Sequence, residues 1–145
     1  MELTTKLVDN AQVALVERFY GEVWNQADEG IAREILHPGF RFRGSLGDER
    51  IGHEGFISYM RTVHAALSNY RCVIDDLVWT EFRVAARMRF TGVHRAPFMG
   101  VPATGRQILW AGAAFFTIAS GQITELWVLG DIDAIRRQLG EPTSP

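Results

Sequence analysis

The sequence contains one cysteine, Cys72, among 145 residues. A single cysteine cannot form a disulfide within one chain, and it cannot supply a cysteine-based zinc site. Cys72 lies in an alternating apolar segment, and this setting predicts a small buried thiol rather than a reactive one. A disulfide framework and a cysteine-ligated metal centre are therefore excluded within the chain.

Long apolar runs and an excess of one charge are also missing. No apolar run approaches the roughly 18 residues that span a bilayer, and residues 1–6 lack the basic-then-apolar pattern of a signal peptide. The net charge is −2, and the fifteen Lys and Arg residues are scattered rather than clustered. We therefore expect a cytoplasmic protein that binds neither nucleic acid nor membrane.

Motifs for metals, cofactors and nucleophilic catalysis are absent from the sequence. The four histidines have no paired-ligand spacing of the His-x-His or His-x-x-x-His kind. There is no Gly-x-Ser-x-Gly motif and no glycine-rich phosphate loop. We therefore expect no cofactor and no metal, which leaves acid–base chemistry without a cofactor, or binding alone.

What is present predicts one domain, residues 1–145, with helices in its first half. Val8–Trp24 repeats apolar residues at three- and four-residue steps, as an amphipathic helix does. Asp28 is a plausible N-cap for a second, short helix, and His53–Leu67 predicts a third. Phe40–Arg43 alternates strictly, as a strand with one buried face does. Gly44–Gly52 is predicted to be a loop.

The second half of the chain changes to the two-residue period of strands. Four segments rich in β-branched and aromatic residues are predicted strands: Tyr70–Trp79, Phe82–His94, Arg106–Ile118 and Gln122–Gly130. Residues 119–122 predict a hairpin turn. A closing helix, Ile132–Leu139, is expected to stop at Gly140. This order predicts an α+β fold in which a long curved antiparallel sheet leaves a hollow beside the helices.

Three segments resemble the SnoaL-like polyketide cyclases (ester cyclases) of the NTF2-like superfamily. They are Val16–Asn25, Arg87–Gly105 and Gly121–Asp131, and the similarity extends over about residues 12–140. The resemblance implies a cone in which the curved sheet wraps around three N-terminal helices, followed by a short C-terminal helix.

The resemblance also implies a catalytic residue. An aspartate at the end of the last strand is the general acid/base of an intramolecular aldol ring closure in cyclases of this family, and Asp131 stands at that position. Asp131 shares strand parity with Trp127, so if Trp127 faces the hollow, Asp131 does too. Burial beside aromatic surface would suit a carboxylate for proton transfer near neutral pH. The alternative is that Asp131 or Asp133 only caps the last helix.

Two further charged or polar candidates lie on the second long strand. His94 would orient the acid or donate to a developing enolate oxygen, or it would only bond loop backbone. Arg87 shares a face with Arg89. Facing the hollow, Arg87 would pair with Asp131 or bind a substrate oxygen; facing outward, it belongs to a solvated stripe or a dimer contact.

Aromatic side chains are the expected substrate contacts. We expect Tyr20, Trp24, Trp110 and Trp127 to line the hollow. Phe98, next to Met99 in the loop 95–105, is a candidate lid residue, and a purely structural cover is the alternative.

These observations predict a cyclase or isomerase without a cofactor, acting on a small hydrophobic carbonyl compound. One alternative is a non-catalytic ligand-binding or dimerisation module. Another is water activation by an Asp131–Arg87 pair, as in the epoxide hydrolases of the superfamily. The broad sheet face also predicts a homodimer.

Overall fold

The computed structural model describes residues 10–140. Val8, at the start of the predicted first helix, and Pro142, after the predicted last helix, lie outside this range. The first helix, α2 (Ala11–Arg18), is capped by Asn10, whose side chain accepts a hydrogen bond from the Val13 N–H at 2.8 Å. It continues directly into a π-helical turn, η1 (Phe19–Trp24).

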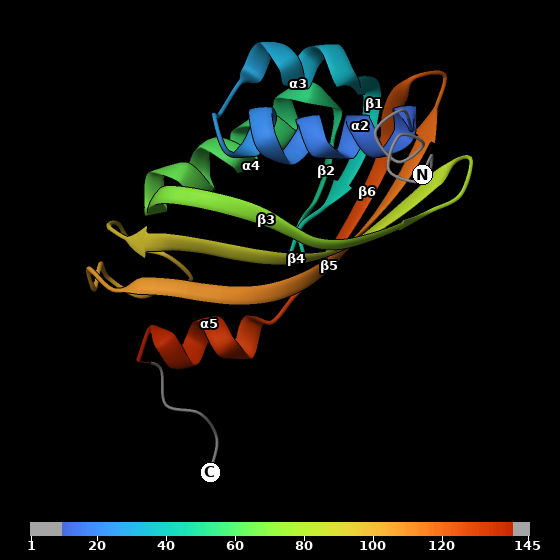
Figure 1. Cartoon of the computed structure of the whole chain (residues 1–145). Coiled ribbons are helices and arrows are strands. Elements are labelled where there is room, and N and C mark those ends of the chain that lie inside the picture. The colour runs from blue at the N-terminus through green and yellow to red at the C-terminus, as the bar shows by residue number, and fades with distance from the viewer. Residues whose placement is uncertain (1–9, 141–145) are drawn as a thin grey trace.

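Two more helices complete one layer of the molecule. Helix α3 (Glu29–Ile35) begins at Asp28, whose carboxylate accepts from the Ile31 N–H at 3.0 Å, so the predicted N-cap is confirmed. Helix α4 (Gly52–Ala66) follows a short segment of sheet. Figure 1 shows these helices together on one side of a strongly bent sheet.

Six strands form that sheet, in the spatial order β2-β1-β6-β5-β4-β3. Their bounds are β1 (Leu36–Arg43), β2 (Glu49–Ile51), β3 (Leu67–Trp79), β4 (Arg83–His94), β5 (Gln107–Ala119) and β6 (Gln122–Gly130). Strands β3 to β6 are the predicted antiparallel meander. The hairpin predicted at 119–122 is confirmed, with Ser120 and Gly121 at φ of 51° and 75°.

Strand β2 was missed, because it lies inside the segment predicted to be a loop. It has only three residues, too few to display an alternating pattern. The neighbour of β1 on its other side is β6, and this pairing is parallel, with Arg41 opposite Glu125 and Arg43 opposite Trp127. The first strand of the chain thus joins the last.

The core fills the space between the helices and the concave face of the sheet. On β4 the buried residues alternate with exposed ones, and Val84, Met88 and Phe90 point inward. From the helices, Phe19 and Phe56 are fully buried, with ring centroids 5.5 Å apart. The predicted α+β fold is confirmed, with a curved sheet that does not close on itself.

The last helix, α5 (Ile132–Gln138), lies beside β5 on the other side of the sheet from α2–α4 (Figure 1). Its Gln138 side chain bonds both backbone groups of Leu109, accepting at 2.8 Å and donating at 2.7 Å. Helix α5 therefore supplies hydrogen-bond partners to the backbone of β5 at Leu109, beyond the point where its pairing with β6 ends. Gly140, at φ 84°, follows the helix as predicted. None of the helices between residues 10 and 140 has the length and apolarity to cross a membrane.

Candidate functional site

An aromatic cavity lies between the helices and the concave face of the sheet. Its volume is about 30 Å³, and its wall includes Tyr20, Trp24, Phe42, Tyr59, Phe90 and Trp110. This is room for one or two water molecules, whereas small-molecule pockets span roughly 300–1,000 Å³. The hollow predicted from the sequence therefore exists, but the aromatic side chains of its wall leave little free volume in it.

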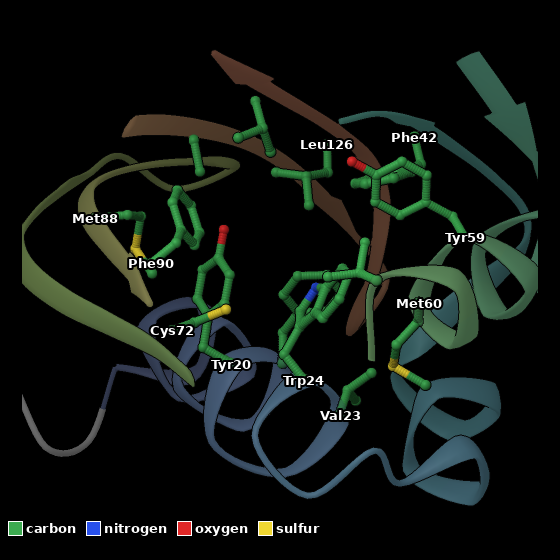
Figure 2. Close-up of a cluster of buried hydrophobic side chains, with 14 of the residues drawn as sticks. Tyr20, Val23, Trp24, Phe42, Tyr59, Met60, Cys72, Met88, Phe90 and Leu126 are labelled. Carbon is green, nitrogen blue, oxygen red and sulfur yellow. The ribbon is translucent and has the colours of Figure 1, made fainter. Parts of the chain in front are cut away.

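The π-helical turn η1 brings two of these residues to the cavity. Tyr20 and Trp24 are four positions apart and both are buried against the sheet (Figure 2). Single π-helical turns inside α-helices occur frequently at functional sites. At its end, the Asn25 side chain bonds the backbone of Cys72 on β3, and this contact fixes the turn against the sheet.

Two polar atoms in the cavity wall have no hydrogen-bond partner among the described residues: Tyr20 Oη and Trp110 Nε1. Their side chains are only 3% and 6% exposed, so bulk water does not reach them. In Figure 2 the Tyr20 hydroxyl points into the space between Phe90 and Leu126. Buried polar atoms are nearly always paired, so two unpaired ones in one wall call for an explanation.

The hydroxyl of Tyr59 belongs to the same wall but has a partner. The backbone N–H of Leu46 donates to it, while burial, the larger effect, raises the pKa of Tyr59 to about 12. The ring lies against Gly44, where a Cβ would stand only 2.5 Å from the Tyr59 hydroxyl. Glycine at this position is therefore what allows the ring to reach the cavity.

His94 is fully buried on the same face of β4 as Phe90. Its Nδ1 accepts from the Thr104 backbone N–H at 3.2 Å and lies 2.9 Å from the Thr104 hydroxyl. A backbone N–H can only donate, so in the neutral ring the proton resides on Nε2. Nε2 has no partner among the described residues. The loop contact expected as the alternative for His94 is thus present, and the ring is held as a hydrogen-bond donor.

A second, open groove of about 430 Å³ lies outside the cavity. Ser45, Leu46 and Phe98 line both spaces, so they form the partition between them. Phe98 is held by a tight turn in which its backbone pairs twice with Val101 at 3.0 Å. The turn residues, Met99 and Gly100, have φ of 52° and 79°. Phe98 is therefore a buried part of the partition, as either a lid or a purely structural cover would be.

The unpaired indole nitrogen of Trp110 lies close to this partition. A Cβ built on Gly130 would stand 3.2 Å from Trp110 Nε1 and 2.6 Å from Ser45 Oγ. The last residue of β6 thus has to be small for both side chains to occupy their places.

Asp131 does not lie on the cavity wall, and that expectation is wrong. The residue is exposed, and its Oδ1 accepts from the Ala134 N–H at 3.0 Å, which makes it the N-cap of α5. The capping alternative is therefore present in the structure. Its neighbour Ile132 lines the outer groove, so Asp131 stands beside the groove rather than the cavity. Oδ2 forms no hydrogen bond with the described residues.

Trp127 and Arg87 also lie outside the cavity, on the convex face of the sheet. Trp127 is 42% exposed, and the guanidinium of Arg43 lies 5.0 Å from its ring centroid. The expectation that Trp127 lines the hollow is therefore wrong. Arg87 is exposed and forms no ion pair with Asp131, so the geometry gives no support to water activation by that pair. Arg89 faces the same way and is paired with Asp75 at 2.8 Å.

Phe42 and Phe90 are cavity residues that the sequence analysis did not select. The strict alternation around each of them was a usable signal, because alternate residues of a half-buried strand share one face. Among residues 10–140, no three His, Cys, Asp or Glu side chains are grouped in a way that would hold a metal ion.

Solved structures with the same fold are similar along nearly the whole chain. A proposed SnoaL-like polyketide cyclase from Jannaschia sp. CCS1 has a TM-score of 0.83 at 26% identity, covering 92% of this chain and 94% of its own. TsrD from Streptomyces laurentii has a TM-score of 0.81 at 28% identity, covering 91% and 96%. IdmH, a proposed polyketide cyclase from Streptomyces antibioticus, has a TM-score of 0.77 at 26% identity, covering 88% and 96%. These similarities show that the protein has an NTF2-like fold.

The family follows from the sequence profile of the SnoaL-like polyketide cyclases, which matches residues 14–139. The chain belongs to this family, as its motifs had indicated. No curated protein matches the sequence.

Proposed function

We propose that the protein is an acid–base enzyme without a cofactor that promotes aldol cyclisation or isomerisation of a small hydrophobic carbonyl compound. Membership of the SnoaL-like polyketide cyclase family supports the reaction class. The observation that carries the proposal is the pair of buried, unpaired donors in an apolar wall, Tyr20 Oη and Trp110 Nε1. Such donors lower the energy of an enolate that forms beside them.

The proposed substrate spans the partition between the cavity and the groove. The cavity alone has about 30 Å³, so the ring of a substrate has to displace Phe98 or Leu46 and use the 430 Å³ groove as well. Tyr20, Trp24, Phe98 and Trp110 are the proposed substrate contacts, because all four lie in the cavity wall.

Asp131 is the proposed proton acceptor, acting from the rim of the groove. Helix capping engages only Oδ1, and Oδ2 is left for proton transfer. His94 lines neither the cavity nor the groove. It is proposed to donate through Nε2–H to the substrate once Phe98, whose ring centroid lies 6.4 Å from that of His94, is displaced. A positioned general base contributes about 10²–10⁴ in rate, so loss of the Asp131 carboxylate should remove the activity almost entirely.

Deuterium exchange at the α-carbon tests the proposal without knowledge of the natural substrate. Acetophenone and ethyl benzoylacetate, incubated in D₂O with the protein, should exchange at a saturable rate above the buffer rate. Asp131→Asn should reduce the exchange at least 100-fold. Exchange of both compounds at the buffer rate, despite saturable binding, would make the protein a binding module instead.

A further inference from the structure

We propose that the outer groove binds a carboxylate of the substrate at Arg136, which makes the substrate a keto acid with its carbonyl end directed toward the cavity. This inference rests on the proposed function for the reacting carbonyl, and it adds the chemical class of the rest of the molecule. It concerns the groove beside α5 and a residue that the proposed reaction does not use.

Four parts of the chain meet at this groove of about 430 Å³: the loop at residues 45–46, helix α4, the loop at residues 97–99 and helix α5. Most of the lining side chains are apolar, namely Leu46, Ala66, Pro97, Phe98, Met99 and Ile132. A groove of this volume fits a small molecule. Because it shares its partition with the cavity, one end of a bound molecule lies against that partition.

The charge in the groove has one sign. Among the described residues that line it, Arg136 is the one charged side chain, and none carries a carboxylate. The other polar side chains there are the hydroxyls of Ser45 and Thr62, and Thr62 donates its proton to the Ser58 carbonyl at 3.0 Å. Complementary charge therefore favours a ligand with an anionic group over one with a cationic group.

The chemistry of Arg136 favours a carboxylate. A guanidinium has five N–H donors in a planar fork, so an anion can bind in addition to the contacts that the side chain makes within the protein. A carboxylate matches two of these donors and carries one charge, which one arginine balances. A phosphate group carries nearly two charges at neutral pH, and the described lining has no second cation for it.

Helix α5 sets the direction in which such a ligand lies. Ile132 and Arg136 are four residues apart, so they share a face of the helix, and both line the groove. Asp131, the proposed proton acceptor, is five residues before Arg136, which is about 7.5 Å along a helix axis. Its negative charge repels a carboxylate, and no charged side chain of the described residues lines the cavity to receive one. The carboxylate therefore lies at Arg136, and the carbonyl lies toward Asp131 and the cavity.

Three probes that share an acetophenone unit test the proposal: 4-acetylbenzoate, its methyl ester and 4-acetylphenyl phosphate, titrated into the full-length protein by NMR. The acid should bind about tenfold more tightly than the ester, as expected for hydrogen bonds to a charged group. This preference should shrink in about 1 M salt, where charges are screened within about 3 Å. The phosphate should bind no more tightly than the acid. Equal binding of acid and ester, or tenfold tighter binding of the phosphate, would overturn the proposal.

Substitutions at Arg136 connect the preference to the residue. Arg136→Gln should abolish the preference for the acid and leave binding of the ester unchanged, so the ester titration reports on the fold. Arg136→Lys keeps the charge and should keep part of the preference. Arg137→Gln, at the next position and paired with Asp133 at 3.4 Å, is the matched control and should keep all of it. A preference that survives in Arg136→Gln, or that Arg136→Gln and Arg137→Gln lose alike, would overturn the proposal.

The same measurements separate this inference from the proposed function. A preference for the acid that depends on Arg136, without α-proton exchange of any probe, would sink the proposed function only. Exchange of acetophenone that depends on Asp131, with acid and ester bound equally, would sink this inference only.

Discussion

The side chain of Asn25 bonds the backbone of Cys72 as a neighbouring strand would. Asn25 Nδ2 donates to the Cys72 carbonyl at 3.0 Å, and the Cys72 N–H donates to Asn25 Oδ1 at 2.7 Å. This pair joins the end of η1 to β3, which is an edge strand of the sheet within residues 10–140. The Asn25 amide therefore ties the helical turn that presents Tyr20 and Trp24 to the sheet, and the His64 ring bonds the Trp24 carbonyl of the same turn at 2.8 Å.

Asn25→Ala should lower the free energy of unfolding by about 1–3 kcal/mol, because it leaves both backbone groups of Cys72 without their partner. Urea denaturation measures the change. Gln26→Ala, at an exposed neighbouring position, is the matched control and should stay within about 0.5 kcal/mol. An equal effect of the two substitutions would show that the Asn25–Cys72 contact contributes little.

Asp131 combines a helix cap with the proposed proton acceptor, and two substitutions separate these roles. Asp131→Ala should cost about 1 kcal/mol of stability, because the Ala134 N–H loses its acceptor. Asp131→Asn keeps a capping oxygen and should preserve the unfolding free energy while it abolishes α-proton exchange. Asp133→Asn, two residues away and exposed, is the control for exchange. Full activity in Asp131→Asn would remove Asp131 from the mechanism.

Phe98 should control access to the cavity, because it is part of the partition between the cavity and the outer groove. Phe98→Leu keeps the site apolar but shortens the side chain. Acrylamide should then quench more of the tryptophan fluorescence, since the buried Trp24 and Trp110 line the cavity behind Phe98. Met99→Ala, in the same turn, is the control. Quenching that is unchanged in Phe98→Leu would place the entrance elsewhere.

The three tyrosines of the chain are all buried, and this predicts a delayed alkaline titration. Burial raises the pKa of Tyr59 to about 12 and raises the pKa of Tyr20 and Tyr70 well above 10. A folded-state pKa above the unfolded value of about 10 stabilises the fold fully below pH 10. This stabilisation is lost as the pH rises toward 12 and beyond. Phenolate absorbance should therefore appear only together with unfolding, as monitored by circular dichroism. If one of the three tyrosines titrated normally, about one third of the phenolate absorbance change would appear near pH 10 in folded protein, and this would contradict the prediction.

The convex face of the sheet carries exposed apolar side chains that a second copy of the chain would cover. Phe115 and Trp127 are both 42% exposed, with ring centroids 5.9 Å apart, and Leu129 beside them is 53% exposed. Apolar patches of this kind mark interaction surfaces. We expect a homodimer, and Leu129→Glu should shift it to monomer in sedimentation velocity. Ile51→Glu, at a 66% exposed site on β2, is the control. A wild-type monomer at all concentrations would rule out this assembly.

Local sequence features predicted most helices and strands correctly. One β-bulge in the last strand made the prediction of the site wrong. Asp28 and Gly140 mark helix ends by their own chemistry, so these boundaries were accessible from the sequence. Trp127 was expected to face the hollow, and Asp131 was expected to share that orientation if the last strand alternates without a break. A register shift between β5 and β6 inserts Thr124 as an extra residue, so Ile123 and Leu126 both point inward and Trp127 points out. A bulge of this kind has no sequence signature here, and it moved Asp131 away from the cavity as well.

The parallel pairing of β1 with β6 sets an order on the folding of the chain. Residues 41–43 find their partners at 125–127, more than eighty positions later. During synthesis β2, with three residues, is the one described strand available to pair with β1 until β6 emerges. Contacts of such long range form slowly. The meander of β3–β6 is therefore expected to assemble first. Pairing of β1 with β6 is then expected to be the last step in forming the sheet.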